Sequence, residues 1–187
     1  MKLLLKFKKT LRENHPEMQK TQTVMQRKIC LLGDFGVGKT SLVRRFVEGR
    51  FDDQYLSTIG VKISRYSLED DNERPINLII WDIAGGEEFS GKHKSYLQGS
   101  VAALLVCDLT RNTTLPSLRT YIARMREVEP EANFTLVANK SDLVDEFEMS
   151  REDVTALADE LGIDSFITSA KEGLFVEDAF KSLVIPK

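Results

Sequence analysis

The most specific chemical pattern in the chain is the stretch Gly33-Asp34-Phe35-Gly36-Val37-Gly38-Lys39-Thr40. It fits the phosphate-loop pattern G-x-x-x-x-G-K-[ST]. Glycines let the backbone curl so that successive N–H groups face one polyphosphate, and a following helix adds the positive end of its dipole. Lys39 can reach the β- and γ-phosphates, and the Thr40 hydroxyl can bind Mg²⁺. The sequence therefore predicts a site for a nucleoside triphosphate and its metal ion.

Three residues further along the chain suit the metal ion and the terminal phosphate. Asp82 ends an apolar strand, and a carboxylate there can bind Mg²⁺ through a water molecule. Thr58 lies in the loop after the first helix and can add a second hydroxyl to the metal. Gly85 has no side chain, so its N–H can approach a γ-phosphate. The predicted metal-binding set is Thr40, Thr58 and Asp82.

Two short motifs suit a purine base. The first, Asn139-Lys140-Ser141-Asp142, follows an apolar strand. The Asp142 carboxylate can accept hydrogen bonds from both the ring N–H and the exocyclic amine of guanine, whereas adenine offers no matching donor pair. In the second motif, Ser169-Ala170-Lys171, the Ala170 N–H can donate to O6 of guanine. The first motif is also common in turns, but Asn139 and Asp142 disfavour an ATP-using kinase or ATPase.

Alternating strands and helices are expected to position these motifs. Residues 29–32 are apolar and precede the phosphate loop, while residues 41–47 follow it with apolar side chains at helical spacing. The predicted strands are 27–32, 61–68, 75–82, 101–106, 134–138 and 165–168. Helices are predicted to about residue 48 after the phosphate loop, and over 115–128, 153–161 and 176–184. This order implies an α/β fold with a mostly parallel sheet covered on both faces.

Each motif comes at the carboxyl end of a predicted strand, where ligands of such sheets bind. A glycine-rich turn that binds nothing remains the alternative for the phosphate loop alone. It does not account for four motifs that occur in order.

Composition fits one soluble globular domain. The chain has 187 residues, of which 42% are hydrophobic and 29% charged. Its two cysteines, Cys30 and Cys107, lie in apolar runs, which favours buried thiols over a disulfide or a metal site. That cysteine usage fits a reducing cytosol, so we expect a cytoplasmic protein. No apolar run approaches the ~20 residues of a membrane span. The net charge of −3 gives no electrostatic reason to expect nucleic-acid binding.

The first twelve residues form a basic appendage on an acidic domain. Five of the 26 Lys and Arg residues lie there with no acid, which leaves 21 basic and 29 acidic residues in the rest. At helical spacing Leu3, Leu4, Phe7 and Leu11 share one face, so residues 1–12 could lie as an amphipathic helix on an anionic membrane. Packing on their own domain or a disordered tail are the alternatives. Residues 13–26 read as a polar linker, and 27–187 as the domain.

The stretches GDFGVGKTSLVRRF, YLSTIGVKIS, WDIAGGEEF, NKSD and TSAK make the sequence resemble the Ras superfamily of small GTPases, and most closely its Rab branch. The resemblance covers roughly residues 27–184. It implies a P-loop NTPase fold whose six-stranded, mostly parallel sheet has one antiparallel strand. It also implies GTP and GDP as ligands, with Mg²⁺, in a monomeric molecular switch.

The resemblance further implies roles for individual residues. Switch regions near 51–62 and 84–96 order around the γ-phosphate and contact effector, exchange-factor and activating proteins. Phe51 packs edge-on to the guanine, Tyr55 closes over the phosphates, and Lys140 lies along the base. The catalytic set is Lys39, Thr58, Gly85 and Gly86. The remaining nucleotide contacts are Gly33, Asp34, Phe35, Gly36, Val37, Gly38, Thr40, Ser41, Asn139, Asp142, Ser169, Ala170 and Lys171.

Two residues depart from the family pattern. Gly86 stands where the family has the glutamine that positions the attacking water, and glycine has no side chain for that task. Phe35 stands where the family usually has a small residue, and its ring can block a water or a partner's arginine. We therefore expect slow hydrolysis of GTP. The alternatives are a GTP-binding scaffold with negligible hydrolysis, or a Phe35 that points away while Glu87 handles the water.

The family also usually ends in a tail with prenylated cysteines. This sequence has no cysteine after Cys107 and ends in Ile185-Pro186-Lys187, so we expect no prenylation of it. Either a longer tail is missing from this sequence, or membrane attachment falls to residues 1–12 or to a partner.

Overall fold

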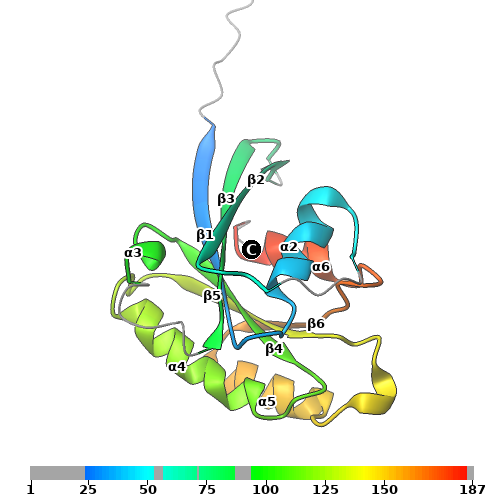
Figure 1. The fold of residues 1–187 in the computed structure, drawn as a ribbon. Helices are drawn as coiled ribbons and strands as arrows, with labels where there is room; N and C mark the ends of the chain where they lie inside the picture. The colour runs from blue at the N-terminus through cyan, green and yellow to red at the C-terminus, as the bar shows by residue number, and fades with distance from the viewer. Residues whose placement is uncertain (1–23, 53–56, 71, 87–93, 185–187) are drawn as a thin grey trace, which may run out of the picture.

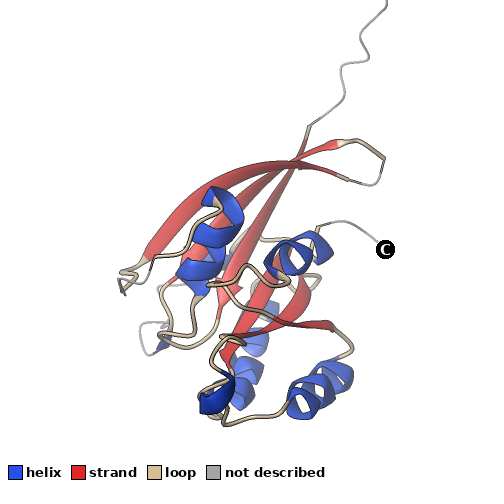
Figure 2. Ribbon diagram, turned by 90° about the vertical axis from the view of Figure 1, so that its right-hand side faces the viewer, coloured by secondary structure: helices blue, strands red, loops and turns tan. Residues whose placement is uncertain are grey.

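The computed structural model describes residues 24–52, 57–70, 72–86 and 94–184. The predictions for residues 1–12, Tyr55 and Glu87 lie outside these ranges, as do parts of both switch regions. Over the described residues the chain forms one sheet with helices packed on its two faces (Figures 1 and 2).

The sheet has six strands in the order β2-β3-β1-β4-β5-β6. β2 pairs antiparallel with β3, and the other neighbouring strands pair in parallel. This confirms the fold expected from the sequence. The strands are β1 (Met25–Leu32), β2 (Val61–Glu69), β3 (Pro75–Ile83), β4 (Ala102–Asp108), β5 (Asn133–Asn139) and β6 (Asp164–Ile167).

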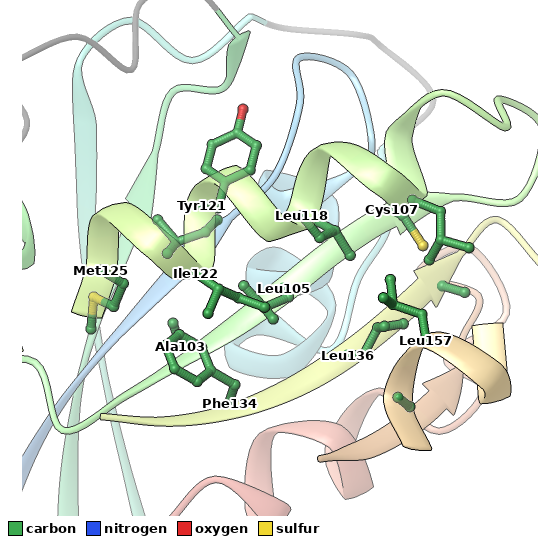
Figure 3. Close-up of a cluster of buried hydrophobic side chains, with 14 of the residues drawn as sticks. Ala103, Leu105, Cys107, Leu118, Tyr121, Ile122, Met125, Phe134, Leu136 and Leu157 are labelled. Atoms are coloured by element: carbon green, nitrogen blue, oxygen red, sulfur yellow. The ribbon is translucent and has the colours of Figure 1, made fainter. Parts of the chain in front are cut away.

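Helices cover both faces of the sheet, as a central strand illustrates. Every residue of β4 is buried, and its side chains alternate between two clusters. Cys107 and its neighbours at alternate positions contribute to the cluster under α3 (Lys94–Leu97), α4 (Thr114–Arg126) and α5 (Arg151–Leu161), drawn in Figure 3. Val106 and its alternate neighbours contribute to the cluster under α2 (Lys39–Glu48) and α6 (Val176–Ser182). Burial on both faces explains why this strand reads as a continuous apolar run.

Two elements, β1 and α5, start two residues earlier than the sequence predicts. β1 begins at Met25, inside the expected linker 13–26, because Met25 and Gln26 continue the ladder with Ile76 and Asn77 of β3. α5 begins at Arg151, two residues early, because Ser150 caps it reciprocally with Asp153. Between β5 and α5 the chain forms a short 3₁₀ helix, η3 (Val144–Glu146).

Both cysteines are buried free thiols, as expected. Burial raises the pKa of Cys30 to about 11 and that of Cys107 to about 12, so neither is a reactive thiolate at neutral pH. Among the described residues, no helix combines the length and the apolar character that a membrane span requires.

Candidate functional site

A cavity of about 220 Å³ opens beside the phosphate loop and brings most of the predicted site residues together. It lies where the carboxyl ends of β1, β3 and β5 meet, because parallel strands end at the same edge of the sheet. The predicted residues that line it are Phe35, Gly36, Gly38, Lys39, Thr40, Ser41, Phe51, Thr58, Gly85, Asn139, Lys140 and Ala170. Three further residues that line the cavity were not predicted from the sequence, namely Arg44, Asp52 and Ala84.

The carbonyl groups of the phosphate loop are held by side chains from outside it. Arg111 donates to the carbonyl of Phe35 at 2.9 Å, and Asn139 Nδ2 donates to that of Val37 at 3.0 Å. A peptide is planar and trans, so the next N–H groups, those of Gly36 and Gly38, point the opposite way. The loop is thereby fixed with two donors available to an anion.

Gly38 cannot be replaced without moving this loop. Its φ of 97° is left-handed, and a Cβ there would lie 2.2 Å from Asn139 Nδ2. The same glycine precedes the first residue of α2, and residues 38–41 line the cavity, so the helix N-terminus faces it.

Lys39 is a buried cation, with only 6% of its surface exposed. Its Nζ donates to the carbonyl oxygens of Gly33 at 2.7 Å and Asp34 at 2.8 Å. Burial lowers the pKa of Lys39 to about 8, although the carboxylates of Asp82 and Asp34 act in the opposite direction. A polyphosphate beside this ammonium group would favour its protonated form.

The predicted metal ligands meet at one point. Thr40 Oγ1 donates to Asp82 Oδ2 at 2.5 Å and lies 2.6 Å from Thr58 Oγ1. Asp82 is 1% exposed, and within the described parts of the chain its Oδ1 has no hydrogen-bond partner. Burial raises the pKa of Asp82, so its charge needs compensation. A carboxylate oxygen and two hydroxyls are hard oxygen donors, and they fit Mg²⁺.

One side chain connects the phosphate loop to the predicted base-binding loop. Besides its contact with Val37, Asn139 accepts hydrogen bonds at Oδ1 from the Thr168 hydroxyl and the Ala170 N–H, each at 3.2 Å. The Ala170 N–H, predicted to donate to O6 of guanine, is therefore engaged within the protein. Its contact with the base stays a prediction. Asp142 Oδ1 accepts from the Ser169 hydroxyl at 2.6 Å, which fixes the carboxylate.

The residues that fix these loops through hydrogen bonds and ion pairs were not predicted from the sequence. Arg45 of α2 donates to the carbonyls of Ala170 and Lys171, and so ties the second base motif to the helix after the phosphate loop. Asp108 is fully buried, 2.6 Å from Lys140 Nζ and 2.9 Å from Arg111 Nε. Burial alone would raise the pKa of Asp108, but hydrogen bonds from Lys140, Thr110 and Arg111 hold it below its usual value. No local pattern marks Arg45, Asp108 or Arg111, because each also makes a contact with a residue distant in sequence, namely Ala170, Lys140 and Phe35 respectively.

The two departures from the expected pattern lie side by side. Phe35 lines the cavity and is 51% exposed. Gly86 has a φ of 85°, and a Cβ there would lie 3.6 Å from the Cβ of Phe35. The Gly86 N–H donates to the Tyr121 hydroxyl at 3.1 Å, a contact that the sequence did not suggest.

The chain is similar to known proteins over most of its length. The protein-family model described as Ras family matches residues 28–185. Rab-31 of Mus musculus is 35% identical over 161 residues, which cover 86% of this chain and 82% of the relative. Rab-22A of Homo sapiens is 37% identical over 82% of this chain and 79% of the relative. RABA1c of Arabidopsis thaliana is 37% identical over 84% of this chain and 73% of the relative.

Proposed function

Since the chain belongs to the Ras family, we propose that it is a molecular switch that binds GTP and GDP with Mg²⁺ and hydrolyses GTP slowly. Members of this family are GTPases that act with effectors, exchange factors and activating proteins. The observation that carries the proposal is that Thr40, Thr58 and Asp82 meet beside the phosphate loop, where Asp82 Oδ1 has no hydrogen-bond partner among the described residues.

In this proposal the phosphates lie along residues 33–41. The N–H groups of Gly36 and Gly38 and the ammonium of Lys39 neutralise the β- and γ-phosphates. Thr40, Thr58 and Asp82 would hold Mg²⁺, and its positive charge would offset the negative charge of the phosphates. The Gly85 N–H donates to the γ-phosphate, and Tyr55 covers it.

Guanine is recognised at the carboxyl ends of β5 and β6. Asp142 accepts from the ring N–H and the exocyclic amine, while Lys140 and Phe51 pack against the base. Support comes from the cavity lining, which includes Phe51, Lys140 and Ala170, and from the Ser169 contact that orients Asp142. Lys171 belongs to the same loop and is held there through its carbonyl by Arg45.

Slow hydrolysis follows from Gly86 and Phe35. The attacking water must be held in line with the γ-phosphate, and Gly86 has no side chain to hold it. The half-exposed ring of Phe35 stands at the cavity, where a partner's arginine would have to enter. The same two residues favour the second candidate function, a GTP-binding scaffold with negligible hydrolysis.

Two measurements test the proposal and separate the candidates. Nucleotide extracted from the purified protein should be GDP or GTP, and retention of adenine nucleotides alone would refute guanine recognition. Protein preloaded with GTP should then release γ-phosphate in a single turnover, slowly but measurably. No release above the rate of free GTP would identify a scaffold, and fast release would show an ordinary GTPase cycle.

We further propose that effectors, exchange factors and activating proteins bind a monomer through switch regions 51–62 and 84–96. The protein is proposed to act in the cytoplasm, with peripheral membrane contact through residues 1–12. The charge pattern of these residues supports membrane contact, because five basic residues surround a short apolar face.

A further inference from the structure

Helix α4 contacts both the phosphate loop and the start of the second switch region. The Tyr121 hydroxyl donates to Asp34 Oδ1 at 3.0 Å and accepts from the Gly86 N–H at 3.1 Å. The Ser117 hydroxyl donates to the other carboxylate oxygen of Asp34 at 2.9 Å. Ser117 and Tyr121 are four residues apart, so they lie on the same side of α4.

The orientation of the Tyr121 hydroxyl is determined by its partners. A carboxylate only accepts, so the single phenol proton goes to Asp34 and a lone pair faces Gly86. The ring is 5% exposed and belongs to the buried cluster under α4, with its hydroxyl pointing away from the other labelled side chains (Figure 3). Burial raises the pKa of Tyr121 to about 12, so the hydroxyl keeps its proton at neutral pH.

The contact depends on glycine at position 86. The φ of 85° is a backbone conformation that residues with a Cβ rarely adopt. Space is not the limit there, because the nearest atom to a Cβ would be 3.6 Å away. Glycine therefore lets the N–H of residue 86 turn toward Tyr121.

The preceding residue lies directly on the phosphate loop. A Cβ on Gly85 would be 2.3 Å from the carbonyl oxygen of Gly33 and 2.4 Å from Lys39 Nζ. The hydrogen bond at Gly86 thus fixes a backbone segment that is already in contact with the groups expected to bind phosphate.

We propose that Tyr121 is a positioning residue for the terminal phosphate: by holding the Gly86 N–H beside Asp34, it keeps the Gly85 N–H over the phosphate loop. The inference rests on the proposed function and deepens it, because it gives a residue outside the nucleotide motifs a part in distinguishing GTP from GDP. Gly86 then has a role of its own, as the residue that makes the Tyr121 contact available.

The test is Tyr121→Phe, which removes the hydroxyl and keeps the ring in the core. The Gly86 amide, followed by NMR in the purified protein, should exchange with solvent about tenfold faster once its acceptor is gone. Affinity for a non-hydrolysable GTP analogue should fall about three- to tenfold, as expected for one lost hydrogen bond. GDP affinity should stay within about twofold, since GDP has no γ-phosphate.

Two further variants serve as controls. Ser117→Ala removes a contact with Asp34 but leaves the Gly86 acceptor, so amide exchange at Gly86 should match that of the wild type. Gly86→Ala should weaken binding of the GTP analogue about as much as Tyr121→Phe. The double variant should show no additional loss, because both changes break the same hydrogen bond.

Failure of this inference is distinguishable from failure of the proposed function. If wild-type protein binds neither GDP nor the GTP analogue, the proposed function is wrong, whatever Tyr121 does. If the wild type binds both, the positioning role is overturned by unchanged exchange at Gly86 in Tyr121→Phe. Equal losses of GDP and GTP-analogue affinity would also overturn it, since they indicate general damage to the site.

Discussion

At the scale of single residues, the ammonium group of Lys39 is the buried charge that we propose binds the phosphates. Burial lowers its pKa to about 8, and the carboxylates of Asp82 and Asp34 only partly offset this. Phosphates bound beside it would raise the pKa again. Binding above about pH 8 therefore takes up a proton, whereas below that pH Lys39 is charged both free and bound.

We accordingly predict that nucleotide affinity is nearly flat around pH 7 and falls as the pH rises through 8 toward 9. Titration calorimetry in buffers of different ionisation enthalpy should detect the proton uptake. Lys39→Arg keeps its charge throughout this range, so any affinity it retains should lack the pH dependence. Identical pH profiles for wild type and variant would show that another group titrates.

Asp142 provides a second prediction at this scale. Asp142→Asn should lower GTP affinity roughly 100-fold, because the amide nitrogen cannot accept from the exocyclic amine of guanine. Binding of xanthosine triphosphate should improve, since xanthine presents a carbonyl at that position and an amide can donate to it. The Asn oxygen can still accept from Ser169, so the loop should remain folded. Competition binding with both nucleotides checks this, and unchanged GTP selectivity would contradict the role of Asp142.

Sequence patterns predicted the site residues that belong to short chemical motifs. They did not predict the residues whose contacts form only when the chain folds. Thr40, Thr58 and Asp82 were expected to meet, and they do. The contact between Tyr121 and Asp34 joins residues 87 positions apart, and no spacing rule connects them. The engagement of the Ala170 N–H by Asn139 was missed for the same reason, since it depends on how two loops pack.

At the scale of elements, alternation of strands and helices was predictable because strands such as β4 read as short apolar runs and helices such as α2 have apolar residues at helical spacing. The first and last residues of the elements were harder to predict. The early start of β1 depends on pairing with β3, and the early start of α5 on the Ser150 cap. α4 was predicted as a helix covering the sheet, but its contacts with the phosphate loop and Gly86 needed the structure.

The start of the second switch region gives a prediction about hydrolysis. Gly86→Gln should raise the rate of γ-phosphate release from preloaded protein roughly tenfold or more, because a side chain can then hold the attacking water. Adding Phe35→Ser should raise it further, most of all with an activating protein. A quenched single-turnover assay of the wild type, both single variants and the double variant measures these rates.

Because the backbone at residue 86 is left-handed, any side chain introduced there adds strain that the hydrolysis experiment must control for. A side chain at φ 85° costs about 1–2 kcal/mol, so Gly86→Gln should lower the thermal unfolding midpoint or shift the local backbone. Gly86→Ala is the matched control, because it carries the same strain without an amide to orient water. If Gly86→Ala and Gly86→Gln accelerate γ-phosphate release equally, positioning of the attacking water by the glutamine side chain is not the cause of the acceleration. If the wild type already matches the double variant, hydrolysis is not impaired.

At the scale of the whole molecule, charge divides the chain into two parts. Residues 1–12 carry five basic side chains and no acid, while the remaining residues hold 21 basic and 29 acidic ones. An anionic surface would attract the first part and repel the second, so orientation on a membrane would follow from charge alone.

Deletion of residues 1–12 tests whether this basic segment binds an anionic membrane. The full chain should sediment with vesicles containing phosphatidylserine, and the truncated chain should lose most of that binding. Added salt should weaken binding of the full chain, since exposed charges are screened within about 10 Å at 0.1 M salt. Vesicles of neutral phosphatidylcholine are the control. Equal sedimentation of both chains with anionic vesicles would exclude a membrane role for this segment.

The hydrogen bonds of Asn139 bear on how long a nucleotide stays bound. Its one side chain holds the phosphate loop through Val37 and the base loop through Thr168 and Ala170. One amide therefore connects the two loops, and we expect a ligand that spans both to be released when that amide loses its hydrogen bonds to either loop. We expect residence times to be long and release to be abrupt rather than stepwise. A partner that speeds exchange needs to displace only one of the two loops, because the other loosens with it.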